Sequence, residues 1–240
     1  MPFMEKYTYS GKYLEIEKYV VTKGGRKRGV KQKESTLAQL KLNEKNTKKK
    51  FTRKLNTNFT IEDIFVTLTF KNKDTITEKE AKKELEKFLR RLRGFRKKTG
   101  LKDLKYICVM ERDNKNGIHF HVVMSAISMD AVNTIWGKGR IQISQLIFSD
   151  NGLEGLANYM LKQQLEKKNV KKWSQSKNLK KPIIKKKIVK KFNPNIHPKA
   201  PKGYKVTNAE LTANEFLGYY LYMQLKKEWF LCLIKVYKRK

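Results

Sequence analysis

Residues 105–124 read KYICVMERDNKNGIHFHVVM, and this stretch decides the expected fold. Two runs rich in β-branched and aromatic residues, 105–111 and 118–124, flank a polar segment that contains Asn116-Gly117. Runs of this kind are typical of strands, and Asn-Gly is a dipeptide that tight hairpin turns favour. The stretch therefore predicts two antiparallel strands joined by a short turn.

Strand and helix patterns continue on both sides of this hairpin. Upstream, residues 64–70 have the composition of a strand, and Thr77 and Glu80 have capping-box spacing ahead of a helix that Gly100 ends. Downstream, the patterns predict a helix at 128–136, a strand at 140–147, a turn at Asn151-Gly152 and a helix at 153–167. The order β-α-β-β-α-β-α predicts an α+β fold, an antiparallel sheet with helices packed on it, of ferredoxin-like type.

Composition divides the chain into three parts. Residues 1–58 form a basic N-terminal extension that is partly helical, with a helix predicted at 35–55. Residues 59–167 carry the strand and helix patterns and form the expected domain. Residues 168–240 begin as a lysine-rich linker, and the spacing of apolar residues then predicts a C-terminal helix at 211–227.

The charge of the chain points to a polyanionic partner. Its 240 residues include 56 Lys and Arg against 22 Asp and Glu, a formal net charge of +34. Nucleic acid is the expected partner, because each phosphate that a basic side chain neutralises releases a condensed counterion. Cys108 and Cys232 lie in apolar runs and are expected to be buried thiols. With no signal peptide and no long apolar run, we expect a cytoplasmic protein that does not enter a membrane.

Two of the three histidines in the chain, His119 and His121, flank Phe120 in the second hairpin strand. Side chains two residues apart on a strand lie on the same face, about 7 Å apart at Cα. The hairpin register places Glu111 across from or diagonal to His119. Two imidazoles and one carboxylate suit an open Mg²⁺ or Mn²⁺ site on a phosphate, and not a closed structural zinc site. The alternative is a pair of strand histidines and an exposed carboxylate with no ligand.

Tyr159 and Lys162 form a second candidate group on the predicted 153–167 helix. Both lie on the far side of the apolar stripe of that helix, and residues three apart are neighbours on its surface. A phenol with its ordinary pKa of about 10 is a poor nucleophile, but a neighbouring cation and a metal-polarised phosphate would favour its attack. The alternative is an ordinary surface tyrosine.

Three motifs in this order carry a resemblance to a known family: 65–70 (FVTLTF), 117–121 (GIHFH) and 159–162 (YMLK). The chain resembles the rolling-circle replication initiators of the HUH endonuclease superfamily, found in plasmids, filamentous phages and small single-stranded DNA viruses. The similarity is tight over 60–165 and looser elsewhere.

The resemblance implies a ferredoxin- or RRM-like HUH endonuclease domain that nicks and rejoins one DNA strand at an origin. It implies that His119, His121 and Glu111 hold Mg²⁺ or Mn²⁺, and that Tyr159 forms a 5′-phosphotyrosine with Lys162 beside it. The implied partners are single-stranded or hairpin origin DNA, and a host DNA polymerase and helicase in a bacterial cytoplasm. The role of Lys162, in charge neutralisation or in DNA positioning, stays open.

Basic and aromatic residues outside these motifs are candidates for DNA contact. We expect contacts from Arg26, Lys27, Arg28, Lys138, Arg140, Trp173, Lys177, Lys180 and Lys181. For Trp136 and Trp173, base stacking and peripheral packing are both open. Two other functions compete: a single-tyrosine HUH transposase or relaxase, and a non-catalytic nucleic-acid-binding sandwich domain. A relaxase usually has its tyrosine before the histidine pair, and a binding module has no need of a converging acid and histidines.

Overall fold

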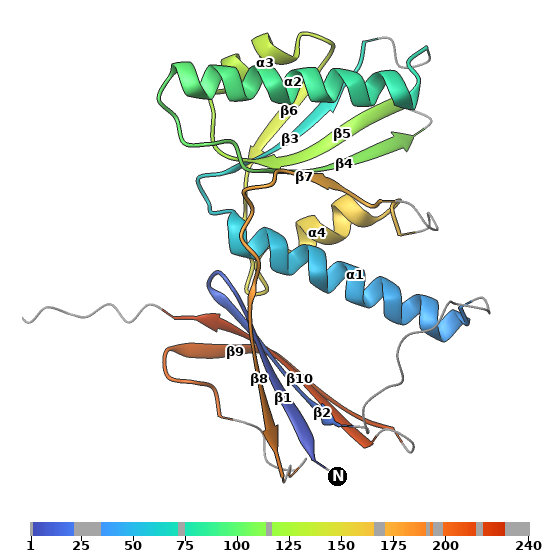
Figure 1. Cartoon of the computed structure of the whole chain (residues 1–240), viewed down its shortest axis with the longest axis vertical. Helices are drawn as coiled ribbons and strands as arrows, with labels where there is room; N and C mark the ends of the chain where they lie inside the picture. The colour runs from blue at the N-terminus through green and yellow to red at the C-terminus, as the bar shows by residue number, and fades with distance from the viewer. Residues whose placement is uncertain are drawn as a thin grey trace, which may run out of the picture. The chain divides into compact units, whose positions relative to one another are not determined.

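The computed structural model describes residues 2–21, 35–71, 75–113, 117–165, 171–190, 193, 199–214 and 218–228. Within these residues the chain forms four helices and two five-stranded sheets with antiparallel pairing (Figure 1). The expected α+β fold with an antiparallel sheet is therefore confirmed. The chain divides into two compact units, one of residues 32–181 and one of residues 1–31 with 182–240.

The first unit contains the predicted β-α-β-β-α-β-α order. Its elements are α1 (Leu37–Asn58), β3 (Ile64–Thr69), α2 (Glu78–Lys98), β4 (Tyr106–Asp113), β5 (Gly117–Met124), α3 (Met129–Trp136), β6 (Ile141–Gln145), α4 (Glu154–Leu161) and β7 (Ser174–Gln175). The strands lie in the order β6-β3-β5-β4-β7, so β5 is at the centre. The two flanking elements, α1 and β7, bring residues from the predicted extensions into this unit.

Local sequence signals explain where these elements begin and end. The Thr77 hydroxyl accepts from the Glu80 backbone N–H, and the Glu80 carboxylate accepts from the Thr77 backbone N–H at 2.9 Å, which confirms the capping box. Helix α3 ends at Gly137, whose φ of 57° is a left-handed conformation that glycine adopts without strain. Helix α4 is shorter than the predicted 153–167 helix, because it ends at Leu161 and turns follow.

The two faces of this sheet are covered by different helices. Alternate strand residues such as Val66, Phe120 and Val122 pack with α2 and α3 in one apolar core. The opposite side chains, among them Val109 and Val123, pack with α1 and α4 in a second core. Hydrophobic burial on both faces fixes the register, because a shift by one residue would exchange the two sets of side chains.

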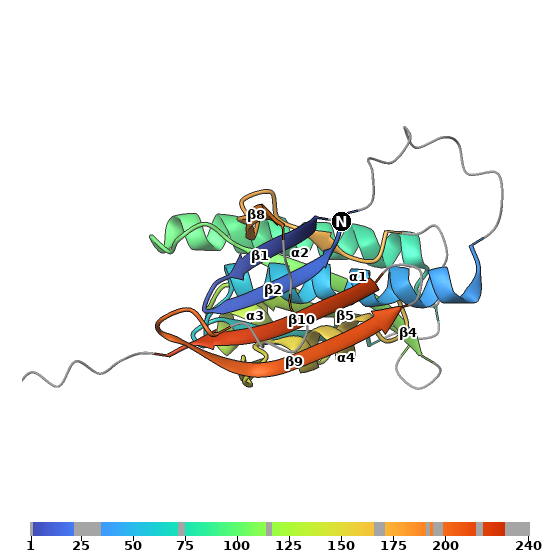
Figure 2. The ribbon, with the colours of Figure 1, turned by 90° about the horizontal axis from the view of Figure 1, so that it is seen from below.

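The second unit is a sheet formed by both ends of the chain. Its strands are β1 (Phe3–Ser10), β2 (Tyr13–Val20), β8 (Ile183–Val189), β9 (Tyr204–Asn214) and β10 (Gly218–Lys227), in the order β8-β1-β2-β10-β9. Figure 2 shows β1, β2, β10 and β9 side by side. Leu14, Ile16, Leu221, Met223 and Leu225 form its apolar core. Ion pairs of 2.5 Å join Lys6 to Glu17 and Lys18 to Glu5 across the β1–β2 hairpin.

The predicted C-terminal helix at 211–227 is wrong. This segment belongs to the hairpin of β9 and β10, with Gly218 opposite Asn214 and Leu221 opposite Leu211. The apolar residues of β10 follow a period of two, and their pairing with β2, some 200 positions earlier in the chain, decides the conformation. The basic N-terminal extension also begins with a hairpin, although its helix at 35–55 is confirmed by α1.

Two further expectations concern cysteines and membranes. Cys108 is a buried free thiol, as expected, and Cys232 lies outside the described residues. No helix in the part of the chain that the structure describes is long and apolar enough to span a bilayer.

Candidate active site

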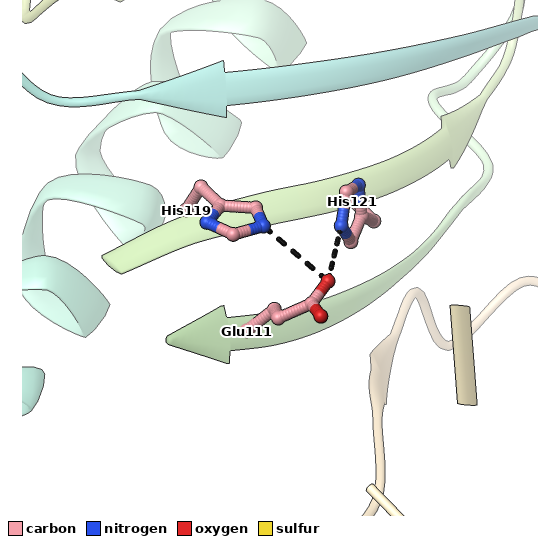
Figure 3. A group of neighbouring side chains, drawn as sticks. All are labelled: Glu111, His119 and His121. Atoms are coloured by element: carbon pink, nitrogen blue, oxygen red, sulfur yellow. Dashed lines mark hydrogen bonds and ion pairs between the residues drawn. The ribbon is translucent and has the colours of Figure 1, made fainter. Parts of the chain in front are cut away.

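Strands β4 and β5 bring one carboxylate and two imidazoles together. Glu111 lies directly opposite His119 in the antiparallel register, and His121 follows on the same face of β5. The Glu111 Oε2 atom is 2.6 Å from His121 Nε2 and 3.3 Å from His119 Nε2 (Figure 3). Between the histidines, Phe120 packs into the opposite core. The period-two spacing therefore gives the two histidines a common direction.

Hydrogen bonds at the other ring nitrogens orient both imidazoles. His121 Nδ1 lies 3.2 Å from the Thr67 hydroxyl on β3, and His119 Nδ1 lies 3.4 Å from the Gly117 carbonyl oxygen. When each Nδ1–H donates to its oxygen, each Nε2 carries a lone pair that points toward Glu111. The backbone carbonyl and the hydroxyl are partners of the kind that usually fix metal-ligating histidines.

The donor set fits a divalent cation. One ligand atom each from Glu111, His119 and His121 lies within 4.8 Å of the others. Burial lowers the pKa of His121 below its ordinary value, although the hydrogen bond to the Glu111 carboxylate opposes this shift. Two nitrogen ligands and one oxygen ligand leave coordination positions open for a substrate.

Substituting Thr67 by valine is expected to weaken Mn²⁺ binding by about 10- to 100-fold. Valine keeps the shape of threonine on β3 but removes the oxygen that holds His121 Nδ1. Mn²⁺ titration followed by electron paramagnetic resonance measures the effect, and Thr67→Ser is the matched control that keeps the hydroxyl. Equal affinities of Thr67→Val and the wild type would show that this hydroxyl does not orient the ring.

A cavity of about 360 Å³ opens over the cluster. Its lining residues are Thr67, Thr69, Phe70, Glu111, Asp113, His119, His121, Arg140, Ile141, Gln142 and Tyr159. The sheet face that α1 and α4 cover elsewhere is thus hollowed at the end that carries the histidines. A substrate in this cavity would reach the cluster and Tyr159 at once.

Tyr159 extends from α4 over this end of the sheet. Ala157, Met160 and Leu161 bury the core side of the helix, while Tyr159 is 53% exposed. Its ring centroid lies 5.0 Å from that of His121. The expectation that Tyr159 lies off the apolar stripe is therefore confirmed, and the phenol is held beside the cluster.

The electrostatics around the Tyr159 hydroxyl disfavour the phenolate while no cation is bound. Partial burial, and then the negative charges of Glu111 and Asp113, raise the pKa of Tyr159 above its ordinary value. A cation at the cluster would offset those charges. The arrangement therefore links the reactivity of the phenol to the charge at the cluster.

Lys162 is not among the residues that line the cavity. It follows the last residue of α4, and its side chain is exposed. The expected helix through residue 167 would have set Lys162 on the same surface as Tyr159 in mid-helix. Its role beside Tyr159 stays a prediction.

The candidate DNA-contact residues are found in several different places. Arg140 lines the cavity, whereas Lys138 points to α2, where its Nζ lies 3.4 Å from the Glu84 carboxylate. Lys177, Lys180 and Lys181 are exposed, and Arg26, Lys27 and Arg28 lie outside the described residues.

Trp136 and Trp173 both pack against protein side chains. Trp136 is 1% exposed, and its indole N–H donates to the Thr69 carbonyl oxygen at 2.9 Å. Trp173 packs on Phe51 with ring centroids 4.9 Å apart, and Lys54 lies over its ring. Of the two roles left open by the sequence, the structure supports packing for both.

Four polar residues that line the cavity are not among the site residues predicted from sequence: Thr67, Thr69, Asp113 and Gln142. Thr67 lies opposite His121 on β3, and Gln142 lies opposite Thr67 on β6. The alternation of side chains along β3 could have indicated Thr67, since Phe65, Thr67 and Thr69 lie on one face of the strand. The sequence contains no comparable signal for Gln142, because only the pairing of β6 with β3 brings it to the cavity.

Part of this chain matches a known protein family. Residues 63–164 match the family described as Replication-associated protein ORF2/G2P. This range includes β3 through α4, and therefore all the residues that line the cavity. Searches of curated proteins and of solved structures found no match.

Proposed function

We propose that this protein initiates rolling-circle replication by nicking one DNA strand with Tyr159. The match of residues 63–164 to the family described as Replication-associated protein ORF2/G2P supports the proposal. The observation that carries the proposal is the position of Tyr159. Its ring centroid lies 5.0 Å from that of His121, and both residues line the same cavity as Glu111 and His119. A nucleophile and a cation-binding cluster are thus held within reach of one phosphate.

The proposed reaction is a transesterification. The Tyr159 oxygen attacks the scissile phosphorus, and the bond between that phosphorus and the 3′ oxygen breaks. The phenol gives up its proton, and the departing oxygen takes one up to become a free 3′-OH. A 5′-phosphotyrosine replaces the phosphodiester, so its energy is retained and a second transfer can rejoin the strand without ATP.

Glu111, His119 and His121 are proposed to hold a divalent ion, Mg²⁺ or Mn²⁺. When bound, this ion would supply positive charge to a phosphate oxygen. The Thr67 hydroxyl and the Gly117 carbonyl hold the two imidazoles in the ligating orientation. Lys162 is proposed to act near Tyr159, either on the developing charge or on the DNA.

The proposed substrate is a single-stranded or hairpin origin. The cavity is open at the sheet surface, and the net charge of +34 favours binding to the DNA backbone. Because nicking leaves a free 3′-OH, a host DNA polymerase is the proposed next partner, with a host helicase separating the strands. The bacterial cytoplasm is the proposed location.

The two competing functions differ from this proposal in testable ways. A single-tyrosine transposase or a relaxase would use the same cluster and tyrosine on a different DNA element. A non-catalytic binding module would form no covalent bond. Neither is favoured by a specific feature of the cavity, and the pairing of one acid with two histidines argues against the binding module.

A covalent-adduct assay tests the proposed function. Overlapping single-stranded oligonucleotides that cover the DNA encoding and flanking this chain are incubated with the protein and MnCl₂. We expect a 3′-labelled oligonucleotide to give an adduct that survives denaturing electrophoresis, because the tyrosine bonds to the downstream fragment. The same oligonucleotide labelled at its 5′ end should release a shorter strand that a polymerase extends. Absence of an adduct on every oligonucleotide would contradict the proposal.

A further inference from the structure

Among the described residues that line the cavity, Arg140 is the only arginine, and no lysine is present. Apart from the two histidines, the other charged residues of the lining are the acidic Glu111 and Asp113. A DNA phosphate that enters this cavity therefore meets two carboxylates and one guanidinium.

Strand pairing places Arg140 and the acidic residues at opposite sides of the cavity. Glu111 pairs with His119 and His119 pairs with Thr69, so these residues form one row across β4, β5 and β3. The Thr69 backbone N–H donates to the Arg140 carbonyl oxygen at 2.9 Å, which adds Arg140 to the end of the row. With strands spaced about 4.8 Å apart, Arg140 lies roughly 10 Å from His119 along the row.

The backbone at Arg140 is held firmly. The Thr69 hydroxyl also donates to the Arg140 carbonyl oxygen, at 2.7 Å, and the Lys71 N–H donates to the Lys138 carbonyl oxygen at 2.9 Å. Between them, Gly139 lies so close to β3 that a Cβ atom would be 2.3 Å from the Thr69 carbonyl oxygen. Position 139 must therefore be glycine. The hydrogen bonds on either side of it fix the backbone from which the Arg140 side chain extends.

No carboxylate within the described residues forms an ion pair with Arg140. Lys138, two residues earlier, has such a partner in Glu84. A guanidinium offers a rigid fork of N–H donors that matches two oxygens of one phosphate, which the single ammonium of a lysine does not.

We infer that Arg140 binds a backbone phosphate of the substrate strand, on the opposite side of the cavity from the Glu111–His119–His121 cluster. The inference rests on the proposed function and adds the path of the DNA. The strand crosses the sheet from β4 toward β6, with one phosphate at the cluster and Tyr159, and a neighbouring phosphate at Arg140. Arg140 lines the cavity and Lys162 does not, so Arg140 is the residue that supplies positive charge there.

The matched control for Arg140 is Arg112. Arg112 lies between Glu111 and Asp113 on β4, and because side chains alternate along a strand it belongs to the opposite face of the same sheet. It is exposed and pairs in register with Ile118, a residue of the core that α2 and α3 cover. Arg112→Gln therefore removes the same charge from the same unit without touching the cavity.

The experiment compares Arg140→Gln, Arg140→Lys and Arg112→Gln with the wild type. Binding of the adduct-forming oligonucleotide is measured by fluorescence anisotropy in EDTA over a series of salt concentrations. Loss of one phosphate contact should reduce the slope of log affinity against log salt by about 0.7 in Arg140→Gln. The oligonucleotide concentration for half-maximal adduct formation should rise about 10-fold or more, with a smaller rise in Arg140→Lys. Mn²⁺ affinity should not change.

Equal salt slopes and equal half-maximal concentrations in Arg140→Gln and Arg112→Gln would overturn the inference. The proposed function has its own readout, since it fails if the wild type forms no adduct on any oligonucleotide. The anisotropy measurement records DNA binding and does not require strand cleavage. If no adduct forms, it is carried out with the oligonucleotide that binds most tightly. It therefore decides the role of Arg140 whether or not nicking occurs.

Discussion

Tyr159→Phe is expected to abolish the covalent protein–DNA adduct while DNA binding and folding stay intact. The substitution removes only the phenolic oxygen that would attack the phosphorus, and the effect on strand cleavage should be at least about 10³-fold. The ring keeps its packing beside His121 and Phe65, with centroids 5.0 and 6.1 Å away. Among the described residues, the Tyr159 hydroxyl forms no hydrogen bond that folding would lose.

Denaturing electrophoresis of the labelled adduct measures this effect, and anisotropy measures DNA binding by the same variant. Tyr219→Phe is the matched control, since Tyr219 is a comparably exposed tyrosine, at 42%, in the other unit. This control should form the adduct at the wild-type rate. An adduct that persists in Tyr159→Phe would show that another residue is the nucleophile.

His119→Gln and His121→Gln are each expected to weaken Mn²⁺ binding by about 100-fold or more and to stop metal-dependent adduct formation. Each removes one of the three ligand atoms that lie within 4.8 Å of one another. Glutamine keeps a polar side chain at these buried positions, which are 5% and 1% exposed. DNA binding in EDTA should be retained, because the basic side chains are unchanged.

Two measurements separate a metal effect from a folding effect. Mn²⁺ affinity is followed by electron paramagnetic resonance, and the thermal unfolding midpoint is recorded for each variant. In the wild type, EDTA should remove the adduct and added MnCl₂ should restore it, whereas neither variant should recover. His197→Gln, at the third histidine of the chain, is the control. If the His119 and His121 variants formed the adduct at the wild-type rate, the cluster would not be required for cleavage.

Much of the first unit could be predicted from sequence because its signals are local. The capping box at Thr77 and Glu80 and the glycine at 137 act over a few residues, and they set helix ends that the structure confirms. The end of α4 was not predictable in the same way. Its apolar residues continue at helical spacing past Leu161, although the helix itself stops there.

Some residues of the candidate site could also be predicted from local sequence signals, and others could not. A strand period of two and a short hairpin were enough to predict that Glu111, His119 and His121 converge, since all three belong to one β4–β5 pair. Thr67 and Arg140 depend on the pairing of β3 with β5 and with β6, between segments that are far apart in the chain. No local pattern records that pairing.

By itself, the sequence determined the order of strands and helices from β3 to α4 and the face that the two histidines share. Only the tertiary structure decided that residues at both chain ends form a second sheet, and that Arg140 reaches the cavity beside Tyr159. The physical reason is that alternation and capping are properties of neighbouring residues. Strand pairing is decided by backbone hydrogen bonds and burial between distant segments, so the 211–227 segment could show helical spacing and still form strands.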